Sequence, residues 1–328
     1  LQLATLEFLA HCGFEVKQSV TRSYVGSIGA LPSVTVLFQR PRDIMVSVAN
    51  GGVDFGITGY DVIAEANAGD KTCVIHDALG FGKCRLVVAV PETWTDVIGV
   101  ADLARKAAGM SQPLRVVTKY PHLTADFLRR HAVHPFTLID AEGSLEVVPE
   151  IGYADIIVDV VETGATLQQN RLRALSDGVM LFSQAALVAN RAALQRSEVM
   201  HVAVALLEYF EAHLRAEGQV MVFANMRGVS AEEVAHKLHT QTTLGGLQGP
   251  TVAPVFPPPA HLRSGVAAGS ENWYAVNLVV RRSELTEAIQ QLRSVGGSGV
   301  VVTPVTYIFE EQPERVRALK TIAGVQSD

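Results

Sequence analysis

One stretch of the sequence places acidic, hydroxyl and glycine residues within a few positions of the end of an apolar segment. The segment Asp155-Ile-Ile-Val-Asp159 is rich in β-branched residues and too short for a helix, so it predicts a buried strand. Glu162-Thr-Gly-Ala-Thr-Leu167 follows and leads into a helical turn that reaches Arg173. A loop that closes onto a helix start presents backbone N–H groups that attract phosphate, and glycine lets the chain approach closely. The loop therefore suits a phosphorylated ligand, although an ordinary turn with a glycine at its corner fits the same residues.

The two acids beside this loop restrict the kind of ligand. Asp159 and Glu162 would repel a bare phosphate, but they can accept hydrogen bonds from the hydroxyls of a sugar phosphate. They also suit a pyrophosphate that arrives with a divalent metal. Thr163 and Thr166 add hydroxyl donors.

Five further turns carry charged or polar side chains next to glycine or proline. They are Arg42-Asp-Ile44, Asp54-Phe-Gly-Ile-Thr-Gly-Tyr-Asp61, Gly80-Phe-Gly-Lys-Cys84-Arg85, Lys119-Tyr-Pro-His122 and Gly143-Ser-Leu-Glu146. Taken alone, Arg42 fits a surface or salt-bridged arginine, and Cys84 fits a small buried residue. No His or Asn is positioned by the sequence to activate Cys84 as a nucleophile. Pro121 also fits the first turn of a capped helix.

Together with Gly152-Tyr-Ala upstream of the strand, these motifs resemble the ATP phosphoribosyltransferase family. The resemblance covers nearly the whole chain. It implies that N1 of ATP displaces pyrophosphate from carbon 1 of phosphoribosyl pyrophosphate, the first step of histidine biosynthesis. It also implies Mg²⁺ as cofactor, held mainly by substrate and water, with no metal site on the protein. Because adenine N1 is already a nucleophile, the enzyme has to orient two anions and neutralise a leaving group.

The resemblance assigns roles residue by residue. Asp159, Glu162 and Arg42 are the expected catalytic residues, with the two acids on the ribose hydroxyls. The expected contacts to phosphoribosyl pyrophosphate are Asp159, Glu162, Thr163, Gly164, Ala165, Thr166 and Leu167. The expected contacts to ATP are Arg42, Asp61, Cys84, Arg85, Lys119, Tyr120, Pro121 and Glu146. The family's opening strand and its Lys-Gly-Arg turn do not precede Leu1, so a first strand and a targeting peptide are expected upstream.

Composition limits the class of protein. The chain has 328 residues, of which 48% are hydrophobic and 18% charged, enough for two or three globular domains. A net charge of −6 argues against nucleic-acid and anionic membrane partners. No apolar run approaches the ~18 residues that a membrane-spanning helix needs. Cys12, Cys73 and Cys84 lack metal-ligand spacing and fit a reducing compartment.

Strand and helix patterns alternate along most of the chain, which predicts an α/β fold with a mainly parallel sheet. The first helix is expected to bury Leu3, Leu6, Leu9 and Ala10 on one face. The resemblance implies a two-lobed, periplasmic-binding-protein-like catalytic core with a cleft between its lobes. The predicted boundaries are residues 1–84 with 176–217 for one lobe, 85–175 for the other, 218–312 for a C-terminal domain and 313–328 for a terminal helix.

The C-terminal segment has the order strand-helix-strand-strand-helix-strand, which predicts a ferredoxin-like (βαββαβ) domain. In the family such a domain binds histidine at subunit contacts and mediates feedback inhibition, and AMP is a second candidate inhibitor. Glycine turns at strand ends make Leu247, Thr251 and Ser298 the candidates for the histidine site, although tight turns without a ligand role fit equally. A homo-oligomer, a dimer or a hexamer, is implied.

Three alternatives stay open on the sequence alone: a non-catalytic regulatory paralogue, a two-lobed small-molecule binding protein, and another kind of phosphoribosyltransferase. The last usually carries adjacent acids at the strand end, whereas Val160 and Val161 separate the two acids here. The motifs near Gly296 and Phe309 look most similar to plant-type relatives. They predict the plastid stroma if the source is a photosynthetic eukaryote, and the cytoplasm otherwise.

Overall fold

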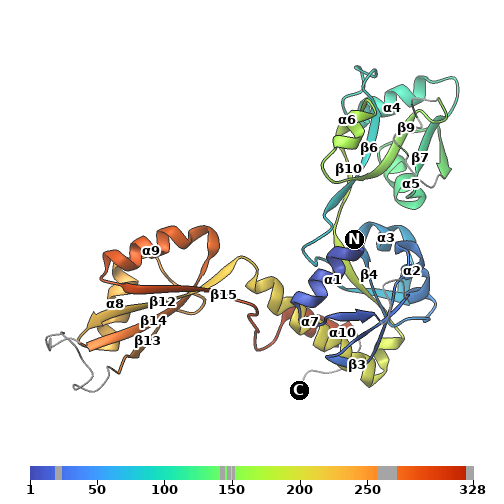
Figure 1. Ribbon diagram of the computed structural model, residues 1–328. Coiled ribbons are helices and arrows are strands. Elements are labelled where there is room, and N and C mark those ends of the chain that lie inside the picture. Colours follow the sequence, from blue (N-terminus) through green and yellow to red (C-terminus); the bar gives the residue numbers. More distant parts are fainter. Residues whose placement is uncertain (19–23, 141–144, 146–148, 150–151, 257–271, 323–328) are drawn as a thin grey trace. The chain divides into compact units, whose positions relative to one another are not determined.

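The computed structural model describes residues 1–18, 24–140, 145, 149, 152–256 and 272–322. The chain divides into two compact units, Leu1–Glu208 with Gln312–Asp328, and Tyr209–Glu311. Figure 1 shows the elements of each unit. The C-terminal unit is therefore inserted into the first, because the chain leaves the first unit after Glu208 and returns to it at Gln312.

The first unit contains three small or medium sheets rather than one. Strands β1 to β3 form an antiparallel sheet, and β11 lies between β4 and β5 in a second sheet. The elements of this part are α1 (Gln2–His11), β1 (Val16–Gln18), β2 (Val25–Ile28), β3 (Leu31–Leu37), α2 (Pro41–Ala49), β4 (Phe55–Gly59), α3 (Tyr60–Ala66), η1 (Gly69–Lys71), β5 (Thr72–His76), β11 (Ala185–Asn190) and η2 (Ala193–Gln195).

The third sheet carries the acidic strand of interest. Its strand order is β10-β6-β9-β7-β8, so β9 lies in the middle, with β6 antiparallel on one side and β7 parallel on the other. Its elements are β6 (Cys84–Pro91), α4 (Val100–Gly109), β7 (Leu114–Thr118), α5 (Pro121–Arg130), β8 (Phe136–Asp140), β9 (Ile156–Val161), α6 (Ala165–Gln169) and β10 (Leu172–Ser183).

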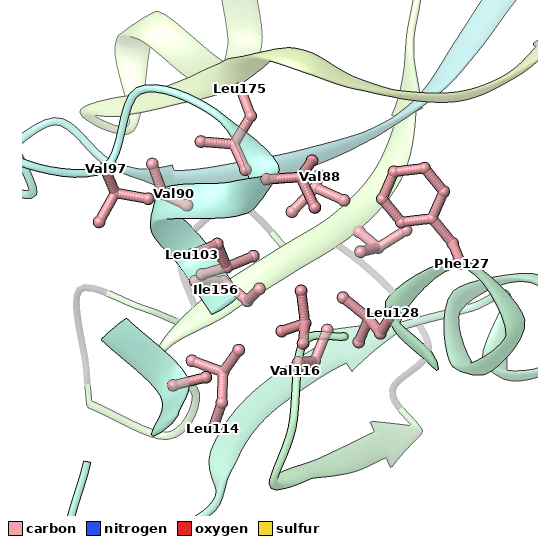
Figure 2. Packing of buried hydrophobic residues seen from close by; sticks show 14 of the residues in the cluster. Val88, Val90, Val97, Leu103, Leu114, Val116, Phe127, Leu128, Ile156 and Leu175 are labelled. Carbon is pink, nitrogen blue, oxygen red and sulfur yellow. The ribbon is translucent and has the colours of Figure 1, made fainter. Parts of the chain in front are cut away.

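Helices α4 and α5 cover one face of this sheet, and the core between them is apolar throughout. Figure 2 shows Leu103 and Leu128 packed against Val116 and Ile156, all fully buried. The other face is buried as well, against Leu145, Ala154 and Leu167. A central strand that is covered on both faces needs a continuous apolar run, which is what β9 has before Asp159.

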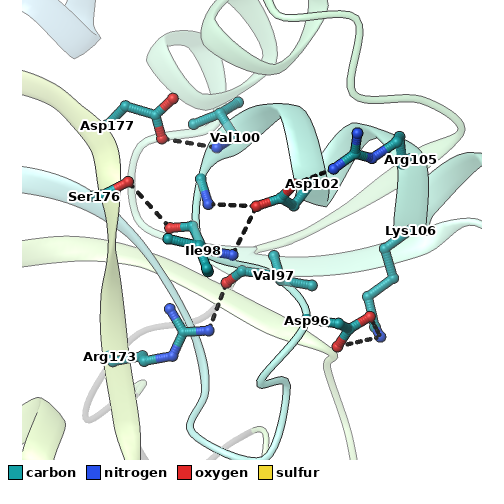
Figure 3. A network of polar contacts seen from close by, with 11 residues as sticks. Asp96, Val97, Ile98, Val100, Asp102, Arg105, Lys106, Arg173, Ser176 and Asp177 are labelled. Carbon is teal, nitrogen blue, oxygen red and sulfur yellow. Dashed lines mark hydrogen bonds and ion pairs between the residues drawn. The ribbon is translucent and has the colours of Figure 1, made fainter.

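Strand β10, which returns the chain along β6, is fixed at its start by polar contacts (Figure 3). Arg173 donates hydrogen bonds to the carbonyl oxygens of Trp94 and Val97, at 2.7 and 2.5 Å. Asp177 accepts a hydrogen bond from the Val100 amide at 2.7 Å, which satisfies a donor at the start of α4. These contacts hold one end of β10, and its other end reaches the candidate site at Ser183.

One sequence prediction about this unit is wrong and another is only partly right. The sheets are not mainly parallel, because among the described strands only β9–β7 and β7–β8 pair in parallel. Helix and strand alternation is typical of parallel sheets, but β6, β10 and β11 pair antiparallel with their neighbours. The first helix buries Leu9 as predicted, but Leu3 is 71% exposed, and Phe8, outside the predicted face, is buried.

The C-terminal unit has the predicted ferredoxin-like topology. Its antiparallel sheet has the order β13-β14-β12-β15, and α8 and α9 cover one face. The N-terminus of α8 is capped by the hydroxyl of Ser230, which accepts a hydrogen bond from the Glu233 amide. The elements are β12 (Gln219–Gly228), α8 (Ala231–Gln241), β13 (Thr251–Pro254), β14 (Asn272–Arg281), η4 (Arg282–Glu284), α9 (Leu285–Ser294) and β15 (Ser298–Pro304).

Two helices join the units along the chain. Helix α7 (Ser197–Ala216) contains the boundary at Glu208, and α10 (Glu314–Ile322) follows the return at Gln312. Within the C-terminal unit, the ring of Tyr209 packs edge-on against Tyr307 and Phe309. None of the helices that the structure describes has the length and hydropathy of a transmembrane span.

Candidate active site

The start of β9 is held by an ion pair with the neighbouring strand. Asp155 receives hydrogen bonds from the Arg115 guanidinium at 2.8 and 3.2 Å and from the Arg115 amide at 2.8 Å. Burial raises the pKa of Asp155. The hydrogen bonds and the charge of Arg115 together lower it by more than burial raises it, so the net shift is downward. Asp155 therefore fixes the strand and takes no place in the site at the other end.

Asp159 lies near the far end of β9 and is 8% exposed. One carboxylate oxygen accepts a hydrogen bond from the Val160 amide at 2.8 Å, and the other is 4.0 Å from Nζ of Lys119. The main-chain carbonyl of Lys119 in turn accepts a hydrogen bond from the guanidinium of Arg42. Three of the residues predicted for the site, from three separate segments, thus meet at Lys119.

The loop after β9 is exposed from Glu162 to Thr166, apart from a partly buried Gly164. Gly164 has φ +87°, a conformation that disfavours any residue with a Cβ, and it precedes the short helix α6. Leu167 is buried and anchors the helix against the sheet. The loop is therefore fixed at both ends while most of its residues are exposed, and the Ala165 amide donates a hydrogen bond to the Thr163 hydroxyl at 3.4 Å. Exposed residues before a helix start suit a phosphate loop.

Asp61 and Tyr120, both predicted to contact ATP, bind each other. The Tyr120 hydroxyl donates to one carboxylate oxygen of Asp61 at 2.5 Å, and the Ser183 hydroxyl donates to the other at 2.6 Å. Burial and the neighbouring carboxylate raise the pKa of Tyr120 far above its usual value, so the phenol stays protonated as a donor. A buried carboxylate with two hydrogen-bond donors has a structural role. Direct contact of Asp61 or Tyr120 with ATP stays a prediction.

Cys84 lies among these groups at the start of β6. Burial is the main cause of its raised pKa, and the charges of Asp61, Glu162 and Asp159 add to it, while a hydrogen bond with Ser183 opposes them. A thiol held protonated by burial and by three acids is a poor nucleophile, in agreement with the sequence interpretation. Cys84, Glu162 and Ser183 line one pocket, so the loop after β9 and the contact between Ser183 and Asp61 lie around the same position.

A pocket of about 460 Å³ opens beside Cys84. Its walls include Lys83 and Arg85 at the start of β6, the acids Asp77 and Glu162, and Phe182 at the end of β10. Phe182 is paired with Arg85 across the two strands and is 74% exposed, which is unusual for a large aromatic ring. The pocket thus combines two cations, two acids and an exposed ring.

Sequence reasoning missed Lys83, Phe182 and Ser183 as pocket or cluster residues. Lys83 stood next to a predicted pair, but β10 had not been predicted as a strand, so nothing indicated that Phe182 would lie opposite Arg85. Pro121 occupies the first turn of α5, where it favours the helix start. Glu146, with the rest of the Gly143–Glu146 turn except residue 145, lies outside the described residues.

The three candidates for a histidine site are not brought together within one copy. Thr251 begins β13 and Ser298 begins β15, and these strands are the two opposite edges of the sheet, with β14 and β12 between them. At about 4.8 Å per strand the edges lie three spacings apart. Leu247 is 53% exposed just before β13, so it lies on the Thr251 side.

Among the residues that the structure describes, no group of three His, Cys, Asp or Glu side chains is arranged to hold a metal ion. Magnesium bound through substrate phosphates needs only one or two protein carboxylates. Glu162 in the pocket wall and Asp159 behind it are of the right chemical type for that mode.

Two family models and several known proteins match this chain. Family models described as "ATP phosphoribosyltransferase" and "HisG, C-terminal domain" match residues 40–209 and 216–307. The chain is 42% identical over 326 residues to ATP phosphoribosyltransferase 2, chloroplastic, of Arabidopsis thaliana, covering 98% of this chain and 78% of that protein. It is 35% identical over 264 residues to an ATP phosphoribosyltransferase of Rhodopseudomonas palustris (strain HaA2), covering 78% of this chain and 81% of that one.

A solved structure supports the fold. The ATP phosphoribosyl transferase (HisG:HisZ) complex from Thermotoga maritima aligns with a TM-score of 0.51 at 23% identity, over 64% of this chain and 94% of that chain. At that identity the likeness establishes the fold alone. The expected fold class, an α/β two-lobed core with a C-terminal sheet domain, is confirmed.

Proposed function

The chain belongs to the ATP phosphoribosyltransferase family, and from this premise we propose how its own residues carry out the reaction. The protein transfers the 5-phosphoribosyl group from phosphoribosyl pyrophosphate to N1 of ATP and releases pyrophosphate, the first step of histidine biosynthesis. The sequence prediction of this activity is confirmed by the family matches. The roles of individual residues are proposals.

The loop after β9 binds phosphoribosyl pyrophosphate in this proposal. The exposed backbone and hydroxyls from Thr163 to Thr166 receive the 5-phosphate, and Asp159 with Glu162 accepts hydrogen bonds from the ribose hydroxyls. Lys119 beside Asp159 balances its charge when the ribose is absent and lies close enough to attract the anionic substrate. Neither acid has to act as a base, because adenine N1 carries its own lone pair.

The pocket beside Cys84 binds ATP. Lys83 and Arg85 are cations suited to its phosphates, and the exposed ring of Phe182 offers a face on which the adenine can stack. Such stacking would hold the base in one plane and so aim N1 at the ribose, which is the orientation effect that this reaction depends on.

One observation carries the proposal. Glu162, from the loop proposed to bind phosphoribosyl pyrophosphate, lines the same pocket as Lys83 and Arg85, the cations proposed to bind the phosphates of ATP. Two anionic substrates held by these groups would therefore be neighbours, which the in-line displacement of pyrophosphate demands.

We also propose Mg²⁺ as cofactor, bound to the pyrophosphate of the substrate. It would neutralise the negative charge of the leaving group. Glu162 in the pocket wall and Asp159 in the preceding strand would hold it, since the substrate supplies most of the ligands. Removal of divalent ions with a chelator should then abolish turnover, and activity that survives chelation would refute a metal requirement.

The C-terminal unit is proposed to bind histidine between copies of the chain, as an inhibitor. Thr251 and Ser298 lie on opposite edges of one sheet, so they can share a ligand only where the edge of one copy meets the other edge of a second. Sedimentation should show that the enzyme is a dimer or a hexamer. Histidine should lower the reaction rate of that oligomer. A fully active monomer that responds to histidine would exclude a site between copies. AMP is a second candidate inhibitor to be titrated in the same assay.

The relatives from Arabidopsis thaliana carry the word chloroplastic in their names, and we propose the plastid as the location of this protein too. Expression of the full-length coding sequence with a fluorescent tag in leaf cells tests this. Fluorescence confined to the cytosol would contradict it.

An assay with ATP, phosphoribosyl pyrophosphate and Mg²⁺ tests the activity directly, with absorbance and pyrophosphate release as readouts. Formation of phosphoribosyl-ATP is expected. Binding of either substrate without product would favour the regulatory-paralogue alternative, and binding of neither would favour a protein that takes a different ligand.

A further inference from the structure

Helix α10 lies beyond the residues that either family model matches, and it belongs to the first unit, which contains the candidate active site. Its residues Val316 and Leu319 are buried, and the helix contacts β5. The chain enters α10 from the C-terminal unit within three residues of the boundary at Glu311. Only Gln312 and Pro313 separate the C-terminal unit from the start of α10.

A polar contact from Arg315 links α10 to the body of the unit. Nη2 of Arg315 donates to a carboxylate oxygen of Asp77 at 2.7 Å, and this hydrogen bond is the main reason that the pKa of Asp77 is lowered. The Asp77 side chain is 63% exposed and that of Arg315 is 35% exposed. An ion pair so accessible to water adds little to folding stability, so its removal should leave the fold intact.

Asp77 stands in the wall between two cavities. It lines the 460 Å³ pocket together with Lys83 and Cys84. With Tyr60 it also lines a second cavity of about 280 Å³, whose outer wall is α10 through Arg315, Leu319 and two neighbours. The substrate pocket and α10 therefore share Tyr60 and Asp77 as a common wall.

The charge of Asp77 has the wrong sign for the pocket. A pocket that receives the phosphates of ATP is hindered by a carboxylate in its wall unless a cation pairs with that carboxylate. Arg315 supplies the cation from outside the pocket. When α10 is docked the pair is neutral as a whole, and when α10 moves away the free carboxylate repels the nucleotide.

We propose that helix α10 holds Arg315 against Asp77, and that Arg315 is a positioning residue that keeps the Asp77 carboxylate neutralised for ATP binding. This inference rests on the proposed placement of ATP in the pocket beside Cys84. It gives the C-terminal unit a route to the substrate site through α10, because release of Arg315 weakens ATP binding without touching the phosphoribosyl loop.

The test uses the full chain and steady-state kinetics with each substrate varied in turn. Arg315→Ala is expected to raise KM for ATP about 3- to 10-fold, the effect of one unpaired charge near a triphosphate, with kcat and KM for phosphoribosyl pyrophosphate little changed. The effect should shrink in 0.5 M salt, which screens the carboxylate. Arg317→Ala, at an exposed arginine on the same helix, is the matched control and should leave KM unchanged.

The double variant Arg315→Ala with Asp77→Asn separates charge from structure. If the carboxylate is the cause, the double variant returns KM for ATP to the wild-type value, even though the ion pair is still missing. The inference is overturned if the double variant keeps the raised KM, or if Arg315→Ala behaves like Arg317→Ala in an active enzyme. A wild-type enzyme without transferase activity would instead refute the proposed function.

Discussion

The role of Asp159 gives the sharpest test of the site, through the substitution Asp159→Asn. Asparagine keeps the size of the side chain and an oxygen that can accept the hydrogen bond from the Val160 amide, now at 2.8 Å. It removes the negative charge next to Lys119 at 4.0 Å. Coulomb's law would give that pair about 4 kcal/mol at an effective dielectric constant of 20. Because the Lys119 side chain is 33% exposed, we discount this to about 1 kcal/mol, so the fold should survive the change.

The effect on catalysis follows from the hydrogen bond to ribose. A hydroxyl bound to a charged acceptor contributes about 1.5–3 kcal/mol and one bound to a neutral acceptor about 0.5–1.5 kcal/mol. One carboxylate oxygen is already used by Val160, so we count a single ribose hydroxyl and a loss of about 1–1.5 kcal/mol. This corresponds to about a 5- to 12-fold fall in kcat/KM for phosphoribosyl pyrophosphate.

The assay varies phosphoribosyl pyrophosphate at saturating ATP and measures ATP binding separately by calorimetry. ATP affinity should stay within about twofold of wild type, since Asp159 does not line the ATP pocket. Asp155→Asn is the matched control: it removes an acid from the other end of the same stretch, so it should lower the melting temperature and leave kcat/KM unchanged. Unchanged kcat/KM in Asp159→Asn, or an equal loss in both variants, would refute the assignment of Asp159 to ribose.

Three further predictions concern the pocket, the buried acid and pH. Phe182→Ala should raise KM for ATP at least roughly fivefold, because about 1 kcal/mol or more of base stacking is lost. Phe182→Tyr keeps a ring and should leave KM for ATP unchanged; an equal rise of KM in both variants would exclude stacking. Tyr120→Phe leaves the buried Asp61 carboxylate without one of its donors and should destabilise the fold by about 1–3 kcal/mol in urea denaturation; an unchanged midpoint would show that the hydrogen bond is dispensable. Because the pKa of Asp155 is lowered in the folded state, its charged form stabilises the fold at pH values above the ordinary aspartate pKa of about 3.9. This stabilisation is lost as pH falls from about 3.9 through the lowered pKa. The stability difference between wild type and Asp155→Asn should therefore be constant near neutral pH and shrink below about pH 4; a difference that is unchanged in acid would contradict this.

Local patterns in the sequence were sufficient for features that depend on neighbouring residues. The β-branched run before Asp159 predicted a strand because a strand buried on both faces needs continuous apolar side chains, and β9 has this property. Gly164 was expected at the corner of a turn between a strand and a helix, and it lies there with φ +87°, a conformation that favours glycine. The ferredoxin-like order of the C-terminal unit followed in the same way from the sequence of strand and helix patterns.

Tertiary structure alone decided which of these local features meet. Tyr120 and Asp61 are 59 positions apart and Arg315 and Asp77 are 238 apart, and nothing near any of them in the sequence indicates its partner. The direction of β10 beside β6 placed Phe182 opposite Arg85 and opened the pocket, whereas strand and helix alternation had predicted mainly parallel pairing. The physical reason is that periodicity records which face of an element is buried, while partners are chosen by packing between elements that are distant along the chain.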